Sequence, residues 1–220
     1  MRIMIHTIPE RFGNAIDMEA ELVTGGFPKD DIFVYIDRDL KGPLPAFLCS
    51  IDWLDRRILD PYEDIWHLQD DVELSKNFVS EIAKCCFLES ADVVCGFASN
   101  ADIIKPGAKG WEAFDMHHSF PCIRIRSWVL SEFARWLKRK EKEEDTWVTS
   151  KIRTGKYDDT LFRRFIYENN LNGSNKPITY KNLIHSLVDH RGDIYGSVAN
   201  PAREDPLRAI NFLDEAESEE

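Results

Sequence analysis

Short apolar segments alternate with segments of helical periodicity along most of this chain. Runs rich in β-branched and aromatic residues predict strands over residues 3–8, 31–37, 64–68 and 92–98. Helices are predicted over residues 11–23, 75–88, 127–140 and 158–168. Strands that alternate with helices are typical of α/β domains. We therefore expect an α/β fold with a single Rossmann-like, mostly parallel sheet flanked by helices.

Glycine and proline mark the ends of some of these elements. The helix over residues 11–23 should stop at Gly25 and Gly26, because glycine adopts a positive φ at little cost. The sequence GPLP at residues 42–45 breaks the chain. Three further elements are predicted, a helix over residues 46–59 and short strands over residues 122–125 and 178–180.

The chain is acidic, with 39 Asp and Glu against 28 Lys and Arg and a formal net charge of −11. A negative surface repels phosphate backbones, which disfavours nonspecific binding of nucleic acid, although a local basic face can coexist with an acidic total. Much of the acid lies near the C-terminus. We expect one domain over residues 1–200, followed by an acidic tail over residues 201–220.

The five cysteines include no pair with the spacing of zinc ligands, so we interpret them as buried, reduced thiols. The first residues lack the apolar core and cleavage site of a signal peptide. No apolar run approaches the length of a membrane span. These features predict a cytoplasmic protein.

Carboxylates follow directly on the strand predicted over residues 64–68, at Asp70, Asp71 and Glu73. Buried carboxylates are costly unless something neutralises them, and hard oxygen ligands favour Mn²⁺ or Mg²⁺. The alternative is an ordinary acidic turn before a helix, where carboxylates stabilise the helix N-terminus. These residues alone leave both interpretations open.

The segment IWHLQDDV at residues 65–72 resembles the strand and DXD element of GT-A glycosyltransferases, particularly those with an lEDDv form. Gln69 stands where those enzymes have an acid. The segment HTIPER at residues 6–11 is similar to the opening loop of that family, which lies against the nucleotide.

Three more segments resemble elements of the same family and follow in the same order. Asp37 ends the second predicted strand, where the family often places an acid or amide against the base or ribose. The sequence DDTLF at residues 158–162 resembles the element that opens a helix beside the acceptor. The sequence SLVDH at residues 186–190 resembles a segment whose histidine often reaches the metal or the diphosphate.

This resemblance implies a metal-dependent glycosyltransferase that uses a nucleotide-sugar, most often a UDP-sugar, with Mn²⁺ or Mg²⁺. The metal ligands it implies are Asp71, Glu73 and His190. The donor contacts it implies are Thr7, Arg11, Asp37, Asp70 and His190. Asp158 and Asp159 are the candidates for the catalytic base on the acceptor side, and inversion follows if that base acts on the acceptor directly.

The acceptor is open between a glycan, a polymer and a modified nucleic-acid base, and the net charge disfavours DNA without excluding it. For Asp158 and Asp159, the simpler interpretation is a helix N-terminus stabilised by acids. His6 and His67 lie in predicted strands, where a core role is the default.

Two other classes of protein are open. A metal-dependent nucleotidyltransferase usually has a glycine-rich basic loop after the first strand, whereas this chain has TIPER at residues 7–11. A catalytically inactive GT-A-like binding module is disfavoured by the acids at residues 70–71 and 158–159 and by His190. Neither a P-loop nor a G-x-G-x-x-G motif is present.

Overall fold

Five of the six strands in the central sheet of the described residues run in the same direction. A computed structural model describes residues 1–39, 42, 44, 47–49, 51, 52, 60, 62–88, 90–97, 121–154, 158–171, 176–182 and 186–190. The strand order is β2-β1-β3-β6-β5-β7, and only β6 is antiparallel to its neighbours. The strands are β1 (Arg2–Thr7), β2 (Ile32–Ile36), β3 (Asp64–Gln69), β5 (Val93–Cys95), β6 (Cys122–Arg126) and β7 (Tyr180–Asn182). The prediction of a mostly parallel, Rossmann-like sheet is confirmed.

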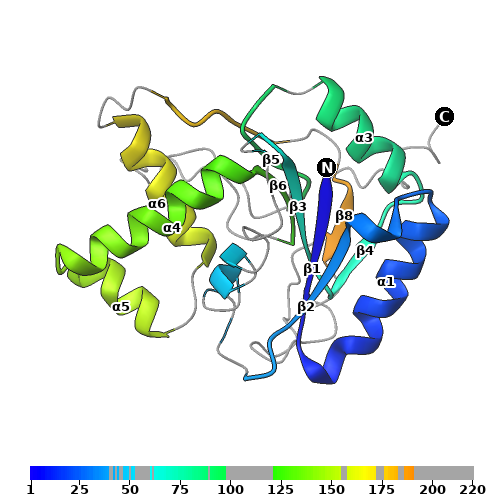
Figure 1. Cartoon of the computed structure of the whole chain (residues 1–220), viewed down its shortest axis with the longest axis horizontal. Helices are drawn as coiled ribbons and strands as arrows, with labels where there is room; N and C mark the ends of the chain where they lie inside the picture. The colour runs from blue at the N-terminus through cyan, green and yellow to red at the C-terminus, as the bar shows by residue number, and fades with distance from the viewer. Residues whose placement is uncertain are drawn as a thin grey trace.

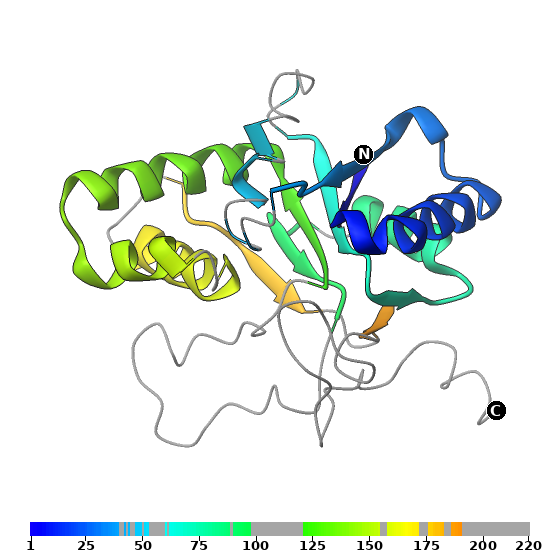
Figure 2. The same ribbon diagram turned by 90° about the horizontal axis from the view of Figure 1, so that it is seen from below.

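Helices cover both faces of this sheet (Figures 1 and 2). On one side lie α1 (Phe12–Thr24) and α3 (Phe78–Leu88), and on the other lie α4 (Ser127–Lys142), α5 (Thr146–Thr154) and α6 (Asp158–Leu171). Two short 3-10 helices, η1 (Pro9–Arg11) and η2 (Lys29–Asp31), precede α1 and β2. None of the described helices is both long and apolar enough to cross a membrane.

A second, two-stranded sheet joins β4 (Val72–Leu74) to β8 (Val188–His190) in antiparallel register. Figure 1 shows this small sheet on the α1 side of the molecule. Neither strand was predicted, and the helix expected from residue 75 begins instead at Phe78. Asp70 and Asp71 therefore lie in a turn between two strands and Glu73 lies in β4, so the interpretation as a turn before a helix is wrong.

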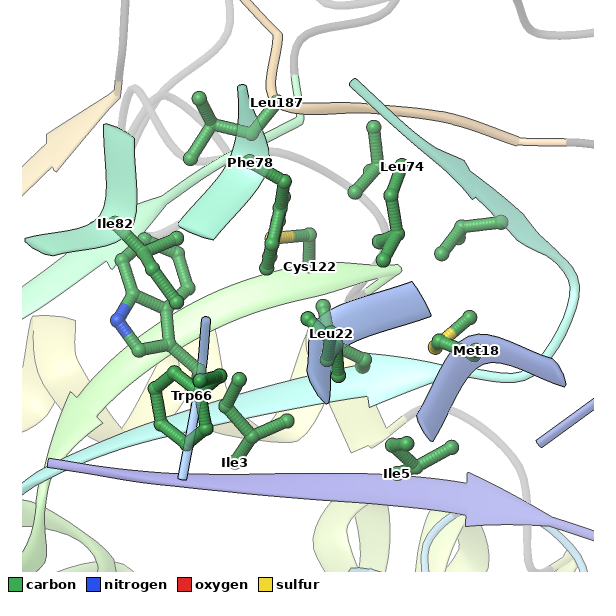
Figure 3. Close-up of a cluster of buried hydrophobic side chains, with 14 of the residues drawn as sticks. Ile3, Ile5, Met18, Leu22, Trp66, Leu74, Phe78, Ile82, Cys122 and Leu187 are labelled. Atoms are coloured by element: carbon green, nitrogen blue, oxygen red, sulfur yellow. The ribbon is translucent and has the colours of Figure 1, made fainter. Parts of the chain in front are cut away.

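The alternation of side chains along β1 divides the core into two clusters. Ile3 and Ile5 pack on the side of α1 and α3, whereas Met4 packs on the side of α4 and α6. Figure 3 shows the first cluster, in which Trp66 of β3 lies beside Phe78 and Ile82 of α3. Because both faces are covered, the central strands are mostly apolar, as parallel strands usually are, although His67 of β3 and Arg124 of β6 are also buried.

Several predicted boundaries match the structure closely. Helix α1 ends at Thr24 with Gly25 as its C-cap, and Gly26 has a positive φ, 96°, in agreement with the stop predicted at these glycines. Residues 47–49, 51 and 52 are helical, in agreement with the helix predicted over residues 46–59, whereas Leu44, in the predicted break, is helical as well. The last strand of the sheet begins at Tyr180, two residues later than predicted. The predicted tail, residues 201–220, lies outside the described residues.

Candidate functional site

The carboxyl ends of β1 and β3 lie side by side at the point where the sheet changes its direction of growth. From β1 the chain passes through α1 to β2 on one side, and β3 then pairs with β1 on the other side. Open α/β sheets bind ligands outside the carboxyl ends of strands at such a switch point. Thr7 is the last residue of β1, and Asp70 directly follows β3.

Four predicted site residues are in direct contact there, and we call them the strand-end group: Thr7, Arg11, Asp70 and Asp71. The Thr7 hydroxyl donates a hydrogen bond to Asp70 Oδ2. Arg11 Nη2 lies 2.9 Å from Asp70 Oδ1, and Arg11 Nη1 lies 2.9 Å from Asp71 Oδ2. The sheet thus brings the opening loop and the acidic turn together, as the resemblance implied.

Burial dominates the electrostatics of the Asp70 carboxylate, whose side chain is 0% exposed. It raises the pKa of Asp70 from 3.8 to about 6, while the hydrogen bond from Thr7 and the charge of Arg11 act in the opposite direction. The neighbouring Asp71 raises this pKa further. Arg11 and Thr7 therefore offset the cost of burying this charge only in part.

His6 occupies the other face of β1, one residue before Thr7. Its ring lies between those of Tyr35 and His67, with centroid distances of 5.8 and 5.9 Å. Burial lowers the pKa of His6 from 6.5 to about 4, against the attraction of Asp37. The imidazole is therefore neutral at pH 7.

His67 fits the predicted core role, because it is 3% exposed and packs edge-on against Phe47 at 5.0 Å. His6 does not fit it completely, since the charges of Asp37, Arg11 and Asp71 all act on its ring. The sequence predicted a core role for His6 and did not indicate its place beside the strand-end group. The signal available was its place directly before the TIPER segment.

Asp37 also lies at this edge of the sheet, immediately after β2. Its backbone N–H donates to the Thr7 carbonyl oxygen at 2.8 Å, and its Oδ2 accepts a hydrogen bond from the Gly42 N–H at 3.3 Å. The residue is 4% exposed. The structure therefore places Asp37 beside the strand-end group, and its contact with a base or ribose stays a prediction.

The β4–β8 pairing brings the predicted residues Glu73 and His190 to the acidic turn. Val72, the residue after Asp71, is paired in register with His190, and Glu73 is paired with Asp189. Glu73 is exposed, whereas Asp189 is only 2% exposed. The backbone thus supports the predicted proximity of His190 to Asp71, and the ligand roles of Glu73 and His190 stay predictions.

Asp158 and Asp159 are the first two residues of α6. Asp159 Oδ1 accepts hydrogen bonds from the N–H and the hydroxyl of Thr160, at 2.6 and 3.2 Å. This geometry ties Asp159 to its own helix, as expected of an acid that stabilises a helix N-terminus. Their role as a catalytic base stays a prediction.

The oxygen ligands of the strand-end group fit a hard divalent cation. Mg²⁺ is commonly held by one or two carboxylates together with substrate phosphates, rather than by a complete protein cage. Within the described part of the chain, no group of three or more His, Cys, Asp or Glu side chains is arranged to hold a metal. That Asp70 and Asp71 hold a cation stays a prediction.

Comparison with known proteins gives no family for the chain. No protein-family model and no curated protein matches it. Eight chains of solved structures match. One, assigned as a glucose-1-phosphate thymidylyltransferase from Bacillus anthracis in complex with sucrose, is 12% identical, with a TM-score of 0.39 over 90% of this chain and 72% of that one. A likeness this low carries no function across to this protein.

Proposed function

We propose that this protein is a metal-dependent glycosyltransferase that binds the diphosphate of a nucleotide-sugar at the carboxyl ends of β1 and β3. The observation that carries the proposal is the contact of Arg11 with both Asp70 and Asp71 at the sheet's switch point. The resemblance of this segment to the DXD element gives the same assignment. The favoured donor is a UDP-sugar.

On the donor side, the proposal gives each residue of the site a distinct task. Asp71, with Asp70 or Glu73, would hold Mn²⁺ or Mg²⁺, and His190 would contribute a nitrogen ligand or a hydrogen bond to phosphate. The bound cation would supply neutralisation of the charge on the departing nucleoside diphosphate. Asp37 would contact the ribose or base. Thr7 orients the Asp70 carboxylate through its hydrogen bond.

On the acceptor side, Asp158 or Asp159 would act as the general base. The carboxylate takes the proton of the acceptor hydroxyl while that oxygen bonds to the anomeric carbon, and the bond from that carbon to the phosphate oxygen breaks. The products are the glycosylated acceptor and the nucleoside diphosphate. Direct attack inverts the anomeric centre. The acceptor itself is a glycan, a polymer or a modified nucleic-acid base.

A thermal-shift screen of nucleotide-sugars with Mn²⁺, compared with excess EDTA, tests the donor site. A ligand at 100 times its Kd stabilises the folded state by about 2.7 kcal/mol, which is readily measured as a rise in Tm. Asp71→Asn should abolish the rise seen with Mn²⁺ and a UDP-sugar. Glu132→Gln is the matched control, because Glu132 is a half-exposed acid that pairs with Arg135 on α4.

The products separate the proposed activity from the other two classes. A glycosyltransferase releases a nucleoside diphosphate, a nucleotidyltransferase releases pyrophosphate, and a binding module releases neither. The proposal would be overturned if none of the nucleotide-sugars raised the Tm of the wild type. It would also be overturned if the rise in Tm were equal for Asp71→Asn and wild type.

A further inference from the structure

We propose that Arg11 is a built-in counter-ion for Asp70 and Asp71 that competes with the divalent cation and is transferred to the donor diphosphate when the cation binds. This inference rests on the proposed function and deepens it. It assigns Arg11 two alternative partners in one binding cycle, beyond a simple donor contact.

The first step of the argument is the shape of the ion pair. The two terminal nitrogens of Arg11 each contact a different carboxylate, at 2.9 Å in both cases. The Asp70 side chain is 0% exposed and that of Asp71 is 12% exposed, so the guanidinium pairs with two largely buried acids. A carboxylate buried without a partner is strongly unfavourable, which explains why a positive charge is kept here.

The second step concerns charge. Arg11 supplies one positive charge against the two negative charges of Asp70 and Asp71, whereas a divalent cation supplies two. A cation coordinated by these carboxylates would lie within a few ångströms of the guanidinium, and like charges at that distance repel. A divalent cation that is coordinated by both Asp70 and Asp71 therefore requires the Arg11 guanidinium to leave these two carboxylates.

The third step is what permits Arg11 to move. Its backbone is fixed at the end of η1, where its N–H donates to the Ile8 carbonyl oxygen at 3.1 Å, and α1 starts at the next residue. The side chain, in contrast, is 26% exposed. The guanidinium can therefore rotate off the carboxylates while its Cα stays at the same edge of the sheet.

The fourth step is where the released guanidinium goes. A diphosphate coordinated to a cation on Asp70 and Asp71 would lie beside Arg11, and the guanidinium fork matches the geometry of phosphate oxygens. Phosphate thus replaces the two carboxylates as its partner. Cation and nucleotide each favour the arrangement that the other needs, so each should raise the affinity for the other by the same factor.

Metal binding without nucleotide tests the competition directly. The Kd for Mn²⁺ is measured by titration calorimetry on the full chain, for wild type, Arg11→Gln and Arg135→Gln. Arg135 pairs with Glu132 on the exposed face of α4, which covers the other face of the sheet from α1 (Figure 1). This control therefore removes the same charge at a different place in the molecule. Arg11→Gln should bind Mn²⁺ about tenfold more tightly than wild type, and Arg135→Gln should match wild type.

In saturating Mn²⁺, the effect of Arg11→Gln on UDP affinity should be opposite to its effect on Mn²⁺ affinity. Here Arg11→Gln should bind UDP about tenfold more weakly than wild type, because the phosphate has lost its guanidinium. Arg11→Lys keeps a charge on the carboxylates and gives a folded variant if Arg11→Gln is unstable; its Mn²⁺ affinity should lie between those of wild type and Arg11→Gln. Mn²⁺ binding that is no tighter in either Arg11 variant than in wild type would overturn the inference.

The two proposals fail separately in this design. The Mn²⁺ titration uses no nucleotide, so the competition can be shown even if no nucleotide-sugar is turned over. Conversely, Mn²⁺-dependent transfer together with unchanged Mn²⁺ affinity in Arg11→Gln would leave the proposed function standing and remove the competition.

Discussion

The Thr7 hydroxyl donates a hydrogen bond to Asp70 Oδ2, although the two residues are 63 positions apart in the sequence. The contact follows from the parallel pairing of β1 with β3, in which His6 is in register with Gln69. The Asp70 N–H also donates to the His6 carbonyl oxygen, at 3.2 Å. Thr7 therefore fixes the carboxylate of Asp70 so that its other oxygen faces Arg11.

Thr7→Val should lower the free energy of unfolding by about 1–2 kcal/mol at pH 8, because a buried carboxylate loses a donor while the side chain keeps its shape. Thr7→Ser retains the hydroxyl and should lose less. Urea unfolding at pH 8 measures both variants. No loss in Thr7→Val, or a larger loss in Thr7→Ser than in Thr7→Val, would show that the hydrogen bond is not the important part.

The opposite pKa shifts of His6 and Asp70 predict two opposing contributions to stability between pH 4 and 6.5. The pKa of His6 is lowered from 6.5 to about 4 by burial, so the unfolded chain binds the extra proton in this range and stability rises with pH. The pKa of Asp70 is raised from 3.8 to about 6 by burial, so the folded chain binds the extra proton and stability falls as the pH rises.

Single variants should separate these contributions, each of which is on the order of 3 kcal/mol. Relative to wild type, Asp70→Asn should gain stability as the pH rises from 4 to 6.5, whereas His6→Gln should lose stability over the same range. Subtracting the wild-type curve removes the contributions of all other groups. Urea unfolding at four pH values checks the signs, and slopes of the same sign in both variants would contradict the assignment.

Gly96 leaves no room for a side chain beside Cys122. A Cβ at position 96 would lie 2.7 Å from Cys122 Sγ and 3.3 Å from the Trp66 ring. Gly96→Ala should therefore cost about 1–3 kcal/mol. In the background of Cys122→Ala, which removes the sulfur, the same change should cost at least 1 kcal/mol less. A double-mutant cycle in urea measures this coupling, and additive losses would argue against a steric conflict.

Asp159 allows the helix-stabilising role to be separated from the catalytic one. Asp159→Asn keeps an oxygen that can accept the Thr160 N–H, so it should change stability by only a few tenths of a kcal/mol, whereas Asp159→Ala should lose about 1 kcal/mol. If Asp159 is the base, Asp159→Asn should also lower the transfer rate about 10²–10⁴-fold at unchanged donor affinity. Normal turnover in both Asp159→Asn and Asp158→Asn would exclude the pair as the base.

The N-terminal half of the fold was predictable because its signals are local. Apolar periodicity and the glycines at positions 25 and 26 define α1, and β-branched runs define β2 and β3. The mostly parallel sheet follows from their alternation. By contrast, the short helix α5 was not predicted, because TWVTSKIRT is rich in β-branched residues, which are weak helix formers.

The site was predictable as a set of residues but not as an arrangement. The resemblance pointed to Arg11, Asp70 and Asp71 separately. That one guanidinium bridges both acids depends on the adjacency of β1 and β3, which the order of elements along the chain does not specify. Strands β4 and β8 were missed because three-residue strands have no measurable periodicity, and their pairing partners are distant in the sequence.

The β4–β8 pairing has a consequence for how the protein is made. Residues 75–187 separate the two strands, so this contact closes a very long loop and carries a high entropic cost during folding. On the ribosome, all six strands of the central sheet are synthesised before β8. The acidic turn therefore lacks the neighbouring β4–β8 pairing until β8 has been synthesised. The backbone N–H of Leu187 donates to the Gly96 carbonyl oxygen at 2.7 Å, and that of Ser75 donates to the Leu187 carbonyl oxygen at 3.0 Å. These hydrogen bonds connect the residue before β8 to segments that are synthesised earlier. A chain interrupted before residue 186 would therefore keep the architecture of the sheet and lack one wall of the site.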